Sequence, residues 1–322
     1  MLKPKTYGPL NTLGDFLAFV AFWLAMWFFR LLPRRLALSL GALLGSLGRF
    51  IPREAQRVRS HLQLAYPEWT AAQVEKTTRQ VFAHLGVVGI EVLRLSGWRG
   101  EKDSRLFSVE GLEHLQQAEA EGKGVLVMSA HIGFWESIGL MLPSLGFTHL
   151  AGVAKTIRNA FITRYMARQR LKHGGMLIDA HRGASKIVRA LADKRVLVIL
   201  MDQRTAVNEG VTVPFFGREA STTPVVSKIA AKQGVPVVPC FIYRNPDYTY
   251  RMVFEPALQL DEDKGEEALV RNTALMTQHI EDAIRREPGQ WCWNYRRWVM
   301  KKRPPEEIVA QREHFGSANP FD

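Results

Sequence analysis

The hydrophobic positions of the chain form one long apolar run and then a series of short apolar runs. Residues Phe16 to Phe29 include no charged side chain. Extended from Leu10 to Leu32, the run is long enough to span a bilayer if Asp15 and Arg30 lie near the two interfaces. The pattern therefore predicts an N-terminal membrane helix, with a buried helix of a soluble domain as the alternative.

A second apolar stretch, Leu36 to Leu47, is shorter and contains several glycines and serines. It is typical of a helix that packs on the membrane surface or on the first helix. The cationic residues that follow the first run outnumber those before it: Arg30, Arg34, Arg35, Arg49 and Arg53 against Lys3 and Lys5. Because Lys and Arg accumulate on the cytoplasmic side of membrane helices, this bias places the rest of the chain in the cytoplasm.

Beyond this region, apolar runs of strand length alternate with amphipathic stretches of helix length. The expected strands are Gly124–Ala130, His149–Ala154, Met176–Asp179, Arg195–Asp202, Val235–Tyr243 and Tyr248–Pro256. The expected helices are Trp135–Leu145, Asn159–His173, Gly183–Ala192 and Pro224–Gln233. Such alternation predicts an α/β fold with a central, mostly parallel sheet flanked by helices.

Composition narrows the function classes. The net charge is +12, and the segment from Ala151 to Leu200 contains eleven basic residues and two acidic ones. Anionic lipid, acidic protein and nucleic acid are the usual partners of such a surface, and solvated helix faces are the plainer explanation. The two cysteines, Cys240 and Cys292, form no Cys-x-x-Cys pair, which argues against a zinc site or a disulfide framework.

His131 and Glu136 are the strongest candidates for chemistry. They stand at the end of an expected strand, in Val125-Leu-Val-Met-Ser-Ala-His-Ile-Gly-Phe-Trp-Glu136. Side chains five positions apart do not share a face of a regular helix. They can meet if His131 lies in a turn, which Gly133 permits, and Glu136 begins the helix. Asp202 also follows an expected strand, where parallel sheets gather functional residues.

Several enzyme signatures are absent from the sequence: Gly-x-Ser-x-Gly, Gly-x-x-x-x-Gly-Lys-[Ser/Thr], Gly-x-Gly-x-x-Gly and His-Glu-x-x-His. What remains is a histidine with a carboxylate, basic surfaces and an apolar anchor.

From roughly Arg30 to Pro304 the sequence resembles the lipid A late (secondary) acyltransferases of the lauroyl/myristoyl type, within the lysophospholipid acyltransferase superfamily. The resemblance rests on ordered motifs: His131-Ile-Gly-Phe-Trp-Glu136 as a His-x4-Glu motif, Asp202-Gln203, Val213-Pro-Phe-Phe-Gly217, Ser221-Thr-Thr-Pro224, Val235-Pro-Val-Val-Pro239 and Glu287-Pro-Gly-Gln-Trp-Cys-Trp293 with Arg296-Arg297-Trp298. Two positions depart from the family pattern. Lys155 stands where the family often has Arg, and Asn159-Ala160 stands where it has Asn-Pro.

The resemblance implies direct acyl transfer from acyl carrier protein to a hydroxyl group, without a metal or other cofactor. His131 would be the general base and Glu136 would orient its ring. A backbone N–H near Gly133, or a basic side chain, would bind the oxyanion. The substrate-binding residues would be Lys155, Arg158, Asn159, Arg170, Asp202 and Gln203, with Arg158 as a possible substitute for the missing arginine.

The implied partners are acyl carrier protein, a lipid A precursor and the anionic inner membrane, and not nucleic acid. The expected domains are a membrane anchor (1–35), a helical membrane-proximal region (36–105), a catalytic acyltransferase domain (106–304) and a C-terminal tail (305–322). The catalytic domain would lie on the cytoplasmic face of the inner membrane. Two alternatives stay open: the same chemistry on a lysophospholipid, ornithine lipid or glycolipid, and a non-catalytic module that binds membrane or acyl carrier protein.

Overall fold

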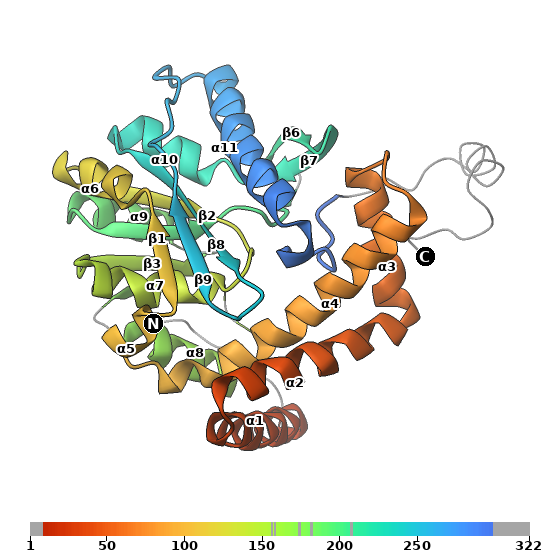
Figure 1. The fold of residues 1–322 in the computed structure, drawn as a ribbon. Helices are drawn as coiled ribbons and strands as arrows, with labels where there is room; N and C mark the ends of the chain where they lie inside the picture. Colours follow the sequence, from red (N-terminus) through yellow and green to blue (C-terminus); the bar gives the residue numbers. More distant parts are fainter. Residues whose placement is uncertain are drawn as a thin grey trace.

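The computed structural model describes residues 9–155, 157, 159–172, 175–180, 183–206 and 209–298. Its centre is a seven-stranded sheet in the order β1-β9-β8-β2-β5-β3-β4 (Figure 1). The strands are β1 (Phe107–Glu110), β2 (Val125–Ser129), β3 (Leu150–Ala154), β4 (Met176–Asp179), β5 (Val196–Leu200), β8 (Val237–Arg244) and β9 (Tyr250–Phe254). All neighbours pair in parallel except β8 and β9. The predicted α/β fold with a mostly parallel sheet is confirmed.

Both faces of the sheet are buried, as strand β2 shows. Its residues Leu126 and Met128 belong to one hydrophobic core, and Val125 and Val127 belong to another. The first core is closed by α3 (Pro52–Ala65), α4 (Ala71–Arg94), α9 (Ala184–Ala192), α10 (Val225–Gln233) and α11 (Glu266–Arg286). The second is closed by α6 (Leu112–Ala120), α7 (Ile138–Met141) and α8 (Ala160–Leu171). Burial on both faces explains why these strands are continuously apolar.

Neither α6 nor α11 was among the predicted helices, and three strands and one further helix also differ from the sequence-based expectation. Strand β1 is only four residues long, and β6 (Val211–Phe215) and β7 (Arg218–Thr222) form a separate hairpin. Its two-residue turn has φ of 51° at Phe216 and 68° at Gly217, which suits the twist of a tight hairpin. The predicted helix from Trp135 to Leu145 is wrong as a single element. It is split into η3 (Trp135–Ser137), α7 and η4 (Leu142–Leu145), where Pro143 cannot continue the hydrogen-bond pattern.

The N-terminal part of the chain is helical. Helix α1 spans Pro9–Leu31 and α2 spans Arg34–Ser46, and the short helix η1 (Leu47–Phe50) follows α2. The segment after α4 forms two further short helices, η2 (Leu95–Gly97) and α5 (Glu101–Ser104). Within α1, residues Leu13–Leu31 are long and apolar enough to cross a membrane, with a mean hydropathy of 1.5, and only 11% of that window is buried. A helix of this length, composition and exposure supports membrane association.

Helix α1 is held to the rest of the molecule at its middle and at its C-terminal end. In the middle, Phe19 stacks on Phe161 of α8 with ring centroids 5.5 Å apart. At its end, the guanidinium of Arg94 donates to the carbonyl oxygens of Phe29 and Leu32. A cation at a helix C-terminus satisfies carbonyls that have no partner within the helix. The anchor is therefore fixed to α8 and α4.

Helices α2 and α4 cross at glycines. A Cβ atom on Gly86 would lie 2.0 Å from the carbonyl oxygen of Gly41 and 2.6 Å from Cα of Gly45. Because that contact is backbone against backbone, no side-chain rotation can relieve it.

We expect Gly86→Ala to lower the free energy of unfolding by about 1–3 kcal/mol, because overpacking forces the two helices apart. Gly89 provides a matched control in the same helix, since a Cβ there meets nothing within 4 Å. Gly89→Ala should be neutral or stabilising by up to about 1 kcal/mol through helix propensity. Urea unfolding in a neutral detergent measures both variants, and equal effects would contradict the close crossing.

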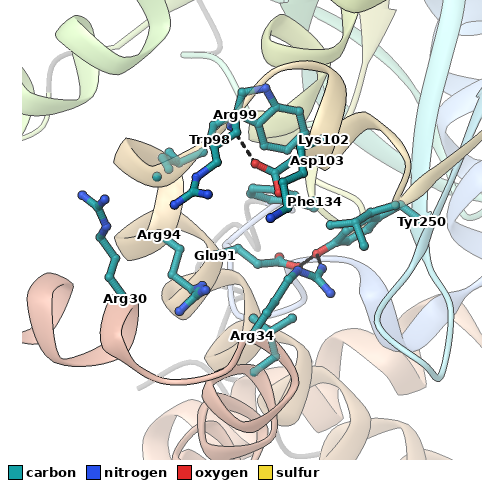
Figure 2. Close-up of a pocket in the computed structure, with 14 residues that line it drawn as sticks. Arg30, Arg34, Glu91, Arg94, Trp98, Arg99, Lys102, Asp103, Phe134 and Tyr250 are labelled. Carbon is teal, nitrogen blue, oxygen red and sulfur yellow. Dashed lines mark hydrogen bonds between the residues drawn. The ribbon is translucent and has the colours of Figure 1, made fainter.

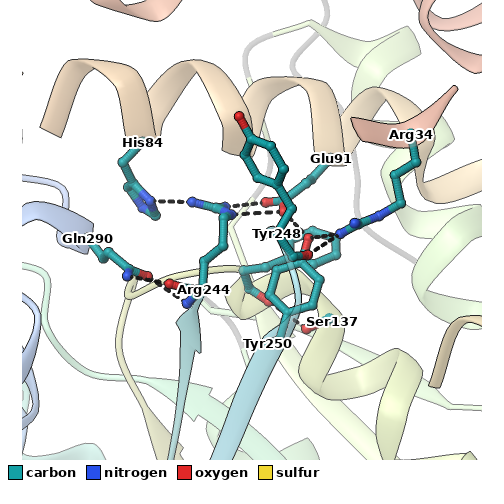
Figure 3. Close-up of polar contacts among 9 residues, drawn as sticks. Arg34, His84, Glu91, Ser137, Arg244, Tyr248, Tyr250 and Gln290 are labelled. Atoms are coloured by element: carbon teal, nitrogen blue, oxygen red, sulfur yellow. Dashed lines mark hydrogen bonds and ion pairs between the residues drawn. The ribbon is translucent and has the colours of Figure 1, made fainter. Parts of the chain in front are cut away.

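A buried polar network joins α4 to the sheet (Figure 3). Arg244 of β8 donates to both oxygens of Glu91, at 3.1 and 2.5 Å, and to Nδ1 of His84 at 2.7 Å. The hydroxyl of Tyr250 donates to Glu91 and accepts from Arg34 of α2. Burial, followed by the charge of Arg244, holds the pKa of His84 well below its ordinary value, so its neutral ring can accept the bond. This network fixes the membrane-proximal helices to the α/β domain.

Candidate active site

His131 and Asp202 meet at the carboxyl edge of the sheet. His131 lies two residues beyond β2 and Asp202 two residues beyond β5, and these neighbouring parallel strands end in register at Ser129 and Leu200. Nδ1 of His131 is 2.7 Å from one carboxylate oxygen of Asp202. The backbone N–H of His131 donates to the other oxygen at 3.1 Å. The sheet topology therefore brings together two residues that are 71 positions apart.

Trp291 completes the support of Asp202. Its indole N–H donates to Asp202 at 2.8 Å, and both side chains are almost fully buried. The sequence analysis did not predict this bond. The signal that could have found it is general, because a buried indole N–H usually needs an acceptor.

The charges of the pair support each other. Burial by itself would raise the pKa of Asp202, but the charge and hydrogen bonds of His131, together with the Trp291 bond, bring it below the ordinary value. Burial would lower the pKa of His131, but the charge and hydrogen bond of Asp202 outweigh it and raise the pKa above the ordinary value. The ionised carboxylate of Asp202 accepts a hydrogen bond from the N–H at Nδ1. In that tautomer of the neutral ring, Nε2 carries no hydrogen and can act as an acceptor.

Nε2 of His131 has a longer contact than Nδ1. The amide nitrogen of Gln203 lies 3.4 Å from it, and the amide oxygen of Gln203 is 3.5 Å from the ammonium of Lys155. The His131 side chain is 22% exposed. The structure therefore places His131, Asp202, Gln203 and Lys155 in one cluster.

Glu136 contacts Arg170 instead of the His131 ring. The guanidinium of Arg170 in α8 binds both carboxylate oxygens, at 3.0 and 2.6 Å. The expectation that Glu136 holds the ring is therefore corrected: among the described residues, the acceptor for the N–H at Nδ1 is the carboxylate of Asp202. Because Gly133 (φ 58°) and the short η3 turn the chain, Glu136 is directed toward α8. Its charge still contributes to raising the pKa of His131.

One further candidate, Asn159, has structural partners. Asn159 caps α8, accepting from the N–H groups of Phe161 and Ile162 at 3.0 Å each and donating to the carbonyl of Asp15 at 2.7 Å. Asn is a preferred N-cap residue, so its observed contacts position α8 against α1. Arg158 lies outside the described residues.

The backbone of Gly133 has a partner that sequence reasoning did not anticipate. Its N–H donates to the carbonyl of Gln290 at 3.1 Å, and an added Cβ would lie 1.9 Å from the carbonyl oxygen of Ile242. Gly133 is therefore required for the close approach of the loop to β8. Its own N–H is engaged, which leaves the proposed oxyanion contact to another donor such as Lys155.

Comparison with known proteins identifies relatives over nearly the whole chain. Residues 9–300 match the family described as bacterial lipid A biosynthesis acyltransferase. The chain is 28% identical to a lipid A biosynthesis acyltransferase of Haemophilus influenzae, over 91% of this chain and 87% of that protein. It is 26% identical to a lipid A biosynthesis palmitoleoyltransferase of Escherichia coli, over 88% of this chain and 90% of that protein. A phosphatidylinositol mannoside acyltransferase of Mycobacterium tuberculosis is 24% identical, over 65% of this chain and 66% of that protein.

Proposed function

The chain belongs to the bacterial lipid A biosynthesis acyltransferase family, and from this we propose that it transfers a fatty acyl chain from acyl carrier protein to a hydroxyl group of a lipid A precursor. The observation that carries the mechanism is the His131–Asp202 pair, in which Nδ1 is held at 2.7 Å by a buried carboxylate while the contact at Nε2, to the amide of Gln203, is 3.4 Å long. This geometry suits a general base.

In the proposed reaction, Nε2 of His131 removes the proton from the acceptor hydroxyl as its oxygen attacks the thioester carbonyl carbon. The new C–O bond forms, the C–S bond breaks, and the proton passes from the imidazolium to the departing thiolate. An alcohol is a weak nucleophile at neutral pH without such a base. Asp202 keeps the ring in the productive tautomer and stabilises the imidazolium.

Glu136 and Arg170 act as positioning residues in this proposal. Their bidentate ion pair, at 3.0 and 2.6 Å, ties the loop after His131 to α8. Such pairs are geometrically specific. Lys155 lies close to both Gln203 and His131: its ammonium is 3.5 Å from the amide oxygen of Gln203, and its charge opposes the rise in the pKa of His131. It is suited to stabilising negative charge on the thioester oxygen.

Surface charge supports the choice of donor and location. The exposed cations of α8 and α9 and their flanks are Arg164, Arg168, Lys172, Lys186, Arg189 and Lys194, and they suit an acidic carrier protein. The exposed apolar surface of α1, which includes Leu17, Leu24 and Phe28, supports a place at the inner membrane. The arginines after α1 support the cytoplasmic orientation.

The test is a transfer assay with the full chain in neutral detergent, acyl carrier protein loaded with a fatty acid, and a lipid A precursor. Mass spectrometry should show the acceptor gaining one acyl group, and His131→Ala should form product at least about 10²-fold more slowly. Acyl-coenzyme A replaces the donor in one control. Mannosylated inositol lipid and lysophospholipid replace the acceptor in two others. Transfer to one of those acceptors only would reject the lipid A precursor, and the absence of turnover with every pair would favour a non-catalytic module.

A further inference from the structure

A cavity of about 460 Å³ lies outside the His131 cluster, between the end of α1, the end of α4 and the segment from Gly97 to Leu106 (Figure 2). Volumes of this size are ordinary for small-molecule sites. Phe134 and Tyr250 line its inner side. His131, Glu136 and Asp202 do not line it, so it is distinct from the proposed catalytic centre.

The cavity collects positive charge. Its cationic lining residues are Arg30, Arg34, Arg94, Arg99 and Lys102. None of them has a carboxylate within 4.0 Å in the part of the chain that the structure describes. The five come from four helices (α1, α2, α4 and α5) and the loop before α5, and Figure 2 shows them arranged around one space. A solvated helix face would not bring cations together in this way.

The two acidic residues of the lining are engaged elsewhere. Glu91 is bound by Arg244 through both oxygens and by the hydroxyl of Tyr250. Asp103 accepts the backbone N–H of Arg99 at 2.6 Å. Burial, followed by the charges of Arg34 and Arg30, lowers the pKa of Arg94. The cations therefore repel one another, and a bound anion would relieve that repulsion.

The position of the cavity indicates where its anion comes from. Arg30 stands in the last turn of α1, beside Leu31, which is 80% exposed, and its guanidinium lies 5.2 Å from the ring centroid of Trp27. Arginine and tryptophan at the end of an exposed apolar helix are typical of the lipid headgroup region. The cavity thus opens at the level where lipid phosphates would lie.

We propose that this cavity binds the phosphate group of an anionic membrane lipid. The choice of a lipid rests on the membrane location proposed above for α1. Arg30 and Arg34 flank the Leu31–Leu32–Pro33 connection between α1 and α2, and Arg94 caps α1. A bound phosphate would therefore hold together the helix that enters the membrane and the helices that carry it to the sheet.

Arg99→Gln/Lys102→Gln tests the proposal, because both side chains are exposed and neither forms a side-chain hydrogen bond or ion pair with the described residues. Lys228→Gln/Lys232→Gln on α10 is the matched control, with the same charge change at two exposed positions away from α1. Calorimetric titration of the full chain in neutral detergent with dioctanoyl phosphatidylglycerol measures affinity. We expect saturable binding that is weakened about tenfold or more in the first variant and less than about twofold in the control.

Each other outcome overturns the proposal. Equal weakening of lipid binding in both double variants would mean that the overall charge of the protein, and not this cavity, determines the affinity. Inorganic phosphate binding as tightly as the lipid would identify a site for a free anion. Equally tight binding of dioctanoyl phosphatidylcholine would remove the preference for anionic lipid, and the absence of saturable binding would remove the site. The titration requires no turnover, so its failure is distinguishable from failure of the acyl-transfer proposal.

Discussion

Asp202→Asn is expected to lower kcat for acyl transfer by about 10³- to 10⁴-fold while leaving the fold intact. The carboxylate accepts from Nδ1 of His131 at 2.7 Å and from Trp291 at 2.8 Å. An amide of the same shape can donate to Nδ1 and so favour the tautomer in which Nε2 carries the proton. The corresponding change in a Ser-His-Asp triad costs about 10⁴-fold in kcat. Steady-state kinetics with the carrier-protein donor and the lipid A precursor measure the effect.

The matched comparison is Glu136→Gln. Glu136 is bound by Arg170, so its loss should disturb the position of the loop and reduce kcat less than Asp202→Asn does. If Glu136→Gln were as damaging and Asp202→Asn were mild, the assignment of Asp202 as the orienting carboxylate would be wrong. Unchanged urea unfolding midpoints would show that both variants report on chemistry.

The pH profile provides a second readout of the same pair. A general base acts in its neutral form, so kcat should rise with pH through the pKa of His131, which Asp202 holds above its ordinary value. Asp202→Asn removes the charge that opposes the effect of burial. The pKa of His131 then falls, and the rising limb of the residual activity moves to lower pH. A purely structural role for Asp202 would leave the position of that limb unchanged.

Arg244→Met is expected to lower the free energy of unfolding by about 3–5 kcal/mol, the usual cost of leaving one partner of a buried ion pair alone. Glu91 is 3% exposed and receives both of its charged hydrogen bonds from Arg244. For a chain of this size the loss corresponds to a fall in Tm on the order of 5–10 °C. Urea unfolding in neutral detergent, followed by tryptophan fluorescence, measures it.

The control is the double variant Arg244→Met/Glu91→Leu. With both charges replaced by apolar groups, the desolvation cost of the lone carboxylate is gone, so the double variant should be more stable than Arg244→Met alone. A loss below about 1 kcal/mol in Arg244→Met would show that the hydroxyl of Tyr250, itself bound by Arg34, is enough to satisfy Glu91.

The predicted strands agree closely with the structure because hydrophobic periodicity is a local property. The apolar run at Val125–Ser129 is buried on both faces, and such runs are recognisable without their neighbours. The β6–β7 hairpin was missed because four of the five residues of β7 are polar and because β6 contains Pro214, which is unusual inside a strand. The helix predicted from Trp135 to Leu145 failed at Pro143, since helical periodicity does not register a missing N–H donor.

The candidate site was predicted in part for the same reason. His131 and Asp202 each follow an apolar strand, and parallel strands bring such positions to one edge. Their direct contact depends on β2 lying next to β5, which the sequence does not encode locally. Trp291 follows α11 in the chain and is brought near Asp202 by an isolated β-bridge between Ile132 and Trp291. No local sequence pattern predicts that contact.

By itself the sequence determined the classes of element, the apolar anchor, the basic surface and the residues capable of acid–base chemistry, because all of these depend on side-chain type and short spacing. Only the tertiary structure decided which carboxylate holds His131. Glu136 is five residues away but pairs with Arg170 of α8, and Asp202 is 71 residues away but lies within 2.7 Å. The same holds for the basic cavity, since Arg30, Arg94 and Arg99 become one site only when α1 packs against the end of α4. Hydrogen bonds and ion pairs act over a few ångströms of space, so the partner of a charge is set by the packing of elements and not by distance along the chain.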